Sequence, residues 1–144
     1  MTYKKILNWM TIAFVALLLF LIIFSNTLAT LSATQVVLEF ASLGEITTIS
    51  ADGTVHTTNH ANIVPLSALK QDGSGYFILY VESVPRRFGS SYYARIIRVD
   101  TGRRNYTHVA VTPILGQDMP AYGIIVASNA FVFAGERVRI VESL

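Results

Sequence analysis

The side chains best suited to catalysis in this sequence are scattered serines, aspartates and histidines. A hydrolytic centre would take Ser67 or Ser74 as its nucleophile and His108 as the base, with Asp72 or Asp100 orienting the imidazole. Neither serine stands in a Gly-x-Ser-x-Gly elbow. His108 lies in a threonine- and valine-rich stretch, which favours a half-exposed sheet residue over a base. We therefore expect no enzymatic activity.

Metal and cofactor sites are equally poorly supported by the sequence. His56 and His60 have the His-x-x-x-His spacing that chelates zinc from one helix face, but the surrounding residues favour strand and turn. They are expected to be solvated loop histidines. Gly73-Ser74-Gly75 lacks the Lys-Ser/Thr pair of a phosphate loop. The chain has no cysteine, so thiolate ligands and disulfides are excluded, and we expect neither a metal nor a cofactor.

The elements that would position these side chains are organised around residues 63–83. Pro65 fixes φ and cannot donate to a strand ladder, so it predicts a turn after a short apolar arm. Leu66 and Leu69 share one side of a single helical turn, which suits a small plug on a sheet. Asp72-Gly73-Ser74-Gly75 predicts a turn, and the strand of residues 76–81 follows with alternate apolar residues on one face.

Further strands and turns recur about every ten residues, and no amphipathic helix appears. A hairpin is predicted around Ala51-Asp52-Gly53, a loop over 83–91, a turn over 102–105, and a loop over 114–122. In the closing strand, Val138 and Ile140 are expected to point inward. The predicted strands span residues 34–40, 45–50, 54–58, 76–81, 92–101, 106–112, 123–127 and 136–141. The fold class is therefore mostly β, a small β-barrel or β-roll.

The order of several short motifs resembles a known family. They are Val-Pro-Leu-Ser-Ala-Leu at 64–69, an Asp-Gly turn, Tyr-Phe-x-x-x-Val-Glu at 76–82, Gly89 followed by Tyr-Tyr-Ala-Arg at 92–95, Gly-Gln-Asp at 116–118, and Gly-Glu-Arg-Val-Arg-Ile at 135–140. Together they are similar to the C-terminal membrane-proximal domain of the periplasmic adaptor, or membrane fusion, proteins of the HlyD and RND-adaptor type. The resemblance covers over half of the chain.

The resemblance implies an accessory subunit that docks on the extracytoplasmic side of an export transporter. The expected partners are a multi-span permease and its ATPase, most simply those of an ABC transporter. This chain lacks the lipoyl-like half and the helical hairpin of complete adaptors, since only about twenty residues separate Phe40 from Ile63. A chain without those parts cannot span a periplasm, which suits a Gram-positive cell.

An apolar N-terminal run predicts a membrane anchor. Residues 6–24 carry no charge, and a helix of that length reaches about 29 Å, close to the thickness of a hydrocarbon core. Lys4 and Lys5 precede it and no Lys or Arg follows before Lys70, so the N-terminus is expected in the cytoplasm. We expect a tail over 1–5, a transmembrane helix over 6–28 and an extracytoplasmic β domain over 29–144. The alternative is a signal peptide cleaved after Thr27-Leu28-Ala29.

Arginine is concentrated in one part of the predicted β domain. Residues 86–104 contain six arginines and one aspartate, a local excess of five positive charges. Arginine pairs with carboxylates and phosphates, so one end of this segment is expected to face lipid head groups and the other a partner. The charges equally suit a solubilising surface. Nucleic acid is not expected, because recognition helices and stacking platforms are missing. The predicted contact residues are Gln35, Glu39, Pro85, Arg86, Arg87 and Phe88.

Two other functions fit the same sequence. The chain could be a free-standing surface module, a tethered β domain that binds a ligand or an envelope component without any transporter. It could also assemble with copies of itself into a ring, as complete adaptors do. A polar outer face on the β domain would favour the free-standing module, whereas exposed apolar surface would favour docking on a partner.

Overall fold

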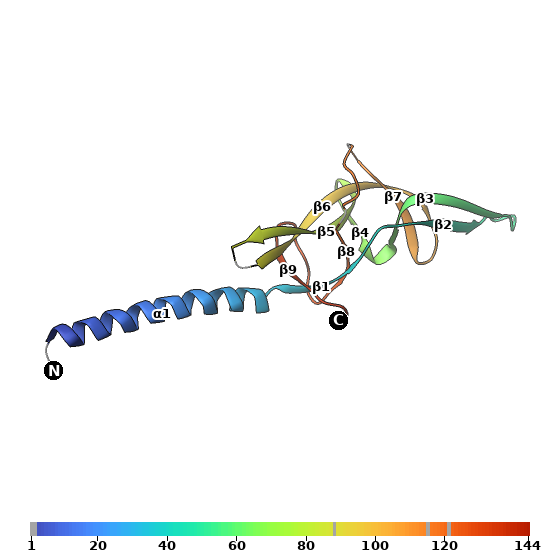
Figure 1. Ribbon diagram of the computed structural model, residues 1–144. Coiled ribbons are helices and arrows are strands. Elements are labelled where there is room, and N and C mark those ends of the chain that lie inside the picture. The colour runs from blue at the N-terminus through green and yellow to red at the C-terminus, as the bar shows by residue number, and fades with distance from the viewer. Residues whose placement is uncertain (1–2, 88, 115, 121) are drawn as a thin grey trace. The chain divides into compact units, whose positions relative to one another are not determined.

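The computed structural model describes residues 3–87, 89–114, 116–120 and 122–144, and it divides into two compact units, Met1–Ala33 and Thr34–Leu144. The first unit is the helix α1, Tyr3–Leu31 (Figure 1). Over Lys5–Leu31 it is long and apolar enough to cross a membrane, and no second such helix occurs among the described residues. The hydroxyls of Thr11 and Thr27 donate to the carbonyls one turn earlier, as an apolar medium requires.

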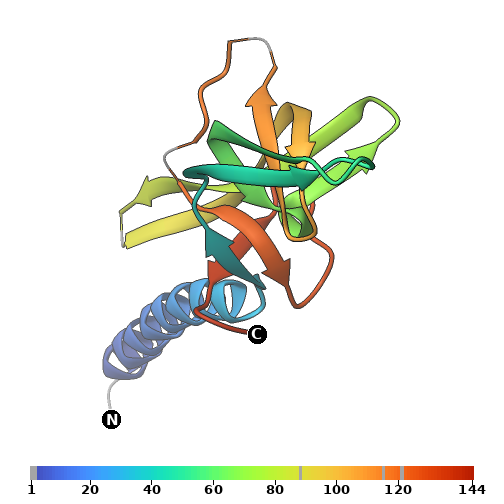
Figure 2. The ribbon, with the colours of Figure 1, turned by 90° about the vertical axis from the view of Figure 1, so that its right-hand side faces the viewer.

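The second unit contains a closed barrel of five strands, which confirms the mostly β prediction. The strands are β1 (Thr34–Glu39), β5 (Gly75–Arg86), β6 (Gly89–Arg104), β8 (Ile124–Ser128) and β9 (Arg137–Ile140). β1 pairs antiparallel with β8 and parallel with β9, and β9 then pairs with β6 and β6 with β5. Tyr80 and Ile124 form the β5–β8 seam that closes the circuit. Figure 2 shows β1, β8 and β9 side by side in teal, orange and red.

Four further strands extend the sheet beyond the barrel. These are β2 (Ser42–Ile49), β3 (Val55–Pro65), β4 (Leu69–Asp72) and β7 (His108–Pro113). β4 pairs with β5 at one edge of the sheet, while β7 pairs with β6, β3 with β7, and β2 with β3 at the other edge. The short 3₁₀ helix η1, Leu66–Ala68, follows Pro65 as the sequence predicts. The β2–β3 and β5–β6 hairpins leave the body of the domain in opposite directions (Figure 1).

Three apolar clusters stabilise this arrangement, of which the smallest joins Ile46, Ile63 and Ala110 on β2, β3 and β7. All five barrel strands contribute to the first cluster, which comprises Val36, Leu79, Val81, Ala94, Ile125, Val132 and Val138. The second lies beneath η1 and comprises Val64, Ala68, Ile78, Ile97, Val99, Val109, Val111 and Ile124. Leu79 and Ile78, neighbours on β5, belong to different clusters because successive strand residues point to opposite faces. The plug predicted at residues 66–69 is a turn over Leu66–Ala68 in which Ala68 is fully buried, while Leu66 and Leu69, on which the prediction relied, are partly buried against this second cluster.

The predicted loop over residues 83–91 is wrong. β5 and β6 instead continue to the end of a long hairpin, where Pro85 pairs with Ser90 and Arg86 with Gly89. Proline is tolerated because only one side of β5 is paired there, so its missing N–H costs no ladder bond. Gly89, at φ +104°, supplies the left-handed conformation that the turn requires.

Three local predictions at the end of the sheet are also corrected. β6 continues through Gly102 to Arg104 by way of an irregular register, and the turn comes later, where the Asn105 side chain accepts from the backbone N–H groups of Thr107 and His108. Tyr106 lies in that turn and not in a strand, and it is fully exposed. Ile140 was expected inside but is 40% exposed, because the last residue of β9 lies at the end of the barrel.

Candidate interaction surfaces of the β domain

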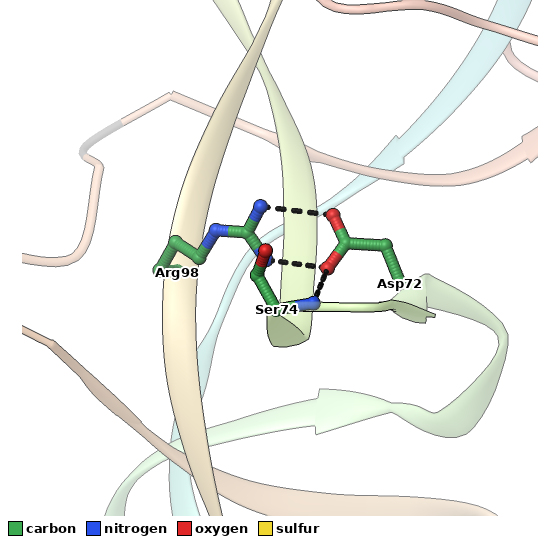
Figure 3. Close-up of polar contacts among 3 residues, drawn as sticks. All are labelled: Asp72, Ser74 and Arg98. Atoms are coloured by element: carbon green, nitrogen blue, oxygen red, sulfur yellow. Dashed lines mark hydrogen bonds and ion pairs between the residues drawn. The ribbon is translucent and has the colours of Figure 1, made fainter.

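Asp72 and Arg98 form an ion-paired clamp across three strands (Figure 3). Arg98 donates from both terminal nitrogens to the two carboxylate oxygens of Asp72, at 2.7 and 2.8 Å. Asp72 Oδ1 also accepts from the backbone N–H of Ser74, and the guanidinium lies 5.8 Å from the centre of the Phe77 ring. The Arg98 hydrogen bonds, followed by the Ser74 bond, lower the pKa of Asp72. The clamp therefore fixes the β4–β5 turn against β6.

The arginine excess of residues 86–104 resolves into paired and exposed groups. Arg95 is paired with Glu82 at 2.7 Å, and Arg98 is paired with Asp72. The positive charges in the middle of β6 are therefore balanced by carboxylates on β5 and β4. Arg86, which donates to the Tyr93 hydroxyl, and Arg87 are exposed at the β5–β6 turn. Arg103 and Arg104 are exposed at the opposite end of β6. The predicted separation of these two arginine pairs is confirmed.

The structure does not gather the predicted contact residues into one site. Pro85, Arg86 and Arg87 lie together at the exposed β5–β6 hairpin end, and Phe88 lies outside the described residues. Gln35 and Glu39 lie near the two ends of β1, about 13 Å apart for four residues of strand. The backbone N–H of Gln35 donates to Asn129 Oδ1, whereas Glu39 is exposed.

The residues considered for chemistry are also dispersed. His56 and His60 lie on β3, about 13 Å apart, so the expectation of loop histidines is wrong, although the expected strand character of the segment is correct. His60 is half buried and its Nε2 has no hydrogen-bond partner in the described structure. His108 Nδ1 is 2.8 Å from the Thr107 hydroxyl. No group of three or more potential metal ligands occurs among the described residues.

The β2–β3 ribbon presents apolar side chains at an unpaired sheet edge. Ile49 and Val55 are paired opposite each other at its outer end, 75% and 63% exposed, and Leu43 at its base is 83% exposed. β2 is the terminal strand of the sheet, so its outer N–H and C=O groups are unpaired by any described strand. A hollow of about 560 Å³ lies beside the ribbon, lined by Thr47, Thr48, Ile49, Leu66, Arg104, Asn105 and Tyr106.

A second exposed apolar feature lies in the loop between β8 and β9. The Phe131 and Phe133 rings are 72% and 65% exposed, and their centres are 4.8 Å apart. This loop was not predicted as a contact surface from the sequence. Its signal was present, because Phe-Val-Phe within seven uncharged residues that precede Glu136 is unusual for a loop on a solvated surface.

Comparisons of the chain with protein-family models, with curated proteins and with solved structures give no match. The resemblance to the adaptor proteins therefore stays a prediction from the sequence.

Proposed function

We propose that this protein is a membrane-anchored accessory subunit whose β domain docks on the extracytoplasmic side of a multi-span membrane partner. The exposed apolar β2–β3 ribbon carries the proposal. A two-stranded ribbon that leaves the core is only marginally stable alone, and its outer end exposes Ile49 and Val55 to solvent. Exposed apolar surface of this kind is typical of an interaction site and favours docking over a purely solvated surface module.

The more specific form of the proposal is an adaptor-like role beside the permease of an export transporter. It is supported by the motif order over residues 64–140 and by a small β-barrel that follows one apolar helix. The β domain would brace or gate the permease by binding alone, with no chemical step. In this arrangement the N-terminus lies in the cytoplasm and the transporter's ATPase joins the complex through the permease.

Site-specific photo-crosslinking in native membranes tests the docking. A photoreactive residue at Ile49 or Val55 is expected to give a crosslink to a multi-span protein. The same residue at the exposed polar Gln71, on the far edge strand β4, is the matched control and should give none. Membranes that retain the protein but show no crosslink at either ribbon position would contradict docking through the ribbon. Recovery of the tagged protein with neither a permease nor an ATPase would contradict the transporter assignment.

A second function is favoured by the hollow beside the ribbon. There Arg104, exposed Tyr106 and the unpaired edge of β2 could hold an extended peptide, with β2 supplying strand addition and Arg104 a carboxylate contact. This would be the tethered surface module. The double change Arg104→Ala and Tyr106→Ala should abolish peptide capture in that case, while leaving the ribbon crosslinks unchanged.

A further inference from the structure

The β8–β9 loop, residues 129–136, is apolar except at its two ends. It reads Asn-Ala-Phe-Val-Phe-Ala-Gly-Glu, and its one charged side chain, that of Glu136, is half buried and accepts from the Thr34 hydroxyl and the Phe133 N–H. Its other polar side chain, that of Asn129, accepts from the backbone N–H of Gln35. Most of the remaining loop surface is apolar and exposed, including both phenylalanine rings. A water-facing loop of this length would ordinarily carry polar or charged side chains.

The loop holds the two rings in a defined position. Val132, between them, is only 6% exposed and belongs to the barrel cluster, so Phe131 and Phe133 must point the other way. The backbone N–H of Phe133 donates to Glu136 Oε2 at 2.9 Å, and Glu136 N–H donates back to the Phe133 carbonyl. Because these contacts already order the loop, its transfer from water to a lipid surface costs little further conformational entropy.

The loop is fastened to the first residues of the β domain. Thr34 donates its hydroxyl proton to Glu136 Oε1 at 2.6 Å. The backbone N–H of Gln35 donates to Asn129 Oδ1, and the backbone carbonyl of Gln35 accepts from the N–H of Asn129. Thr34 is three residues beyond Leu31, the last residue of the apolar helix. Covalent linkage alone keeps those two residues within about 10 Å of each other. If the helix crosses a bilayer, the fastened loop is held close to the lipid surface.

We infer that Phe131 and Phe133 insert into the head-group and upper acyl region of the leaflet from which the chain emerges. The inference rests on the membrane-spanning helix of the proposed function. The bilayer is the occupant that matches the loop, because exposed phenylalanine side chains bury into the boundary between head groups and acyl chains, and the one neighbouring charge, Glu136, is held by the Thr34 hydroxyl and the Phe133 N–H. The rings give the β domain a second attachment point beside its covalent linker. Two attachment points restrict the tilt of the domain and so fix the direction in which its ribbon faces a partner.

Fluorescence quenching in proteoliposomes tests the insertion. The full-length protein is reconstituted into phosphatidylcholine–phosphatidylglycerol vesicles containing brominated lipid. Trp9, the only native tryptophan, lies in the helix and reports on helix insertion in the unaltered chain. In a Trp9→Phe background, Phe131→Trp places a probe in the loop, and Leu43→Trp places a matched probe on the exposed β2 strand.

The expected result is a blue-shifted emission for the probe at position 131, quenching by brominated lipid, and protection from iodide. The probe at position 43 should show the opposite on all three counts. Equal iodide access at positions 131 and 43, with Trp9 quenched, would overturn the loop insertion and leave the anchor intact. An unquenched Trp9 would overturn both the insertion and the membrane anchor. No partner protein is present in the vesicles, so docking on a permease does not affect either outcome.

Discussion

Asp72 and Arg98 show how a single side-chain pair can define a local structure. The carboxylate holds the turn through the Ser74 N–H and holds β6 through two bonds from Arg98.

Both side chains are over a third exposed, so we expect a small but measurable loss of thermal stability for Asp72→Asn. Arg98→Lys should lose nearly as much, because lysine cannot make the two parallel bonds. Asp118→Asn, at an exposed loop carboxylate, is the control. Thermal melting followed by circular dichroism measures all three, and equal melting of wild type and D72N would contradict the role.

Glu136 makes the stability of the domain sensitive to acid. The Thr34 hydroxyl, and after it the Phe133 N–H, hold the pKa of Glu136 below its ordinary value. A carboxyl group with a lowered folded-state pKa stabilises the fold at a pH above its unfolded-state pKa. That contribution is lost as the pH falls through the lowered value. We therefore expect the melting temperature to fall over that acidic interval.

The variant Glu136→Gln should show a weaker dependence on pH over the same interval and a lower stability at neutral pH. Thr34→Val should act in the same direction, because it removes the hydroxyl donor while retaining the shape of the side chain. Melting curves recorded across the acidic range measure both effects. A glutamine variant with the full pH dependence of the wild type would assign that dependence to other carboxylates.

Among the structural elements, β1 and the start of β8 approach closely at Gly123, the residue before β8. A Cβ at Gly123 would lie 2.7 Å from Leu38 Cβ, closer than packed atoms approach. Gly123→Ala should therefore separate the strands and destabilise the fold by about 1–3 kcal/mol. Gly73→Ala is the matched control, because nothing lies within 4 Å of a Cβ there. Chemical denaturation measures the difference, and a neutral Gly123→Ala would show that β1 and β8 are not packed as described.

Two exposed arginine pairs lie near opposite ends of β6, and substituting the pair at the hairpin end tests whether that end contacts a partner. Arg86 and Arg87 lie at the β5–β6 hairpin end, and Arg103 and Arg104 lie near β2. If the hairpin contacts a partner or lipid, alanine at positions 86 and 87 should reduce recovery of the membrane complex several-fold. Lysine at positions 86 and 87 keeps the charge of the hairpin end and serves as the control. Recovery of the alanine double variant at the wild-type level would assign Arg86 and Arg87 to a solubilising role.

Local signals predicted most of these elements, whereas long-range pairing was not predictable. The Asp52-Gly53 and Asp72-Gly73 turns and the Pro65 turn were identified correctly because turn chemistry resides in a few adjacent residues. The end of the β5–β6 hairpin was not predicted, because Pro85 and Gly89 are residues that usually end a strand. They are compatible with this hairpin because one side of β5 is unpaired there, which the sequence does not reveal. The exposed β2–β3 ribbon was missed for a related reason. Exposure of Ile49 depends on what the rest of the chain fails to cover, and no short window of sequence contains that information.

At the scale of the whole molecule, the protein combines an apolar helix with a β domain that exposes apolar side chains on its β2–β3 ribbon and its β8–β9 loop. The helix exposes apolar side chains along its described length, so in water it would aggregate unless lipid or protein covered it. The β domain buries its own apolar clusters, yet it also exposes apolar side chains on the ribbon, on the β8–β9 loop and at single positions such as Phe40. The ribbon and the loop are the two features for which the proposals above name a membrane or a membrane protein as the cover.

The topology implied by the lysines at positions 4 and 5 gives the last prediction. The chain has no cysteine, so a single introduced cysteine reports its location without interference. Ser74→Cys, at an exposed turn, should react with a membrane-impermeant maleimide on intact cells. Thr2→Cys should react only after the membrane is permeabilised, because the positive charges keep the N-terminus in the cytoplasm. A cysteine at position 74 that is labelled only after lysis would place the β domain inside the cell. Docking on an extracytoplasmic face would then be impossible.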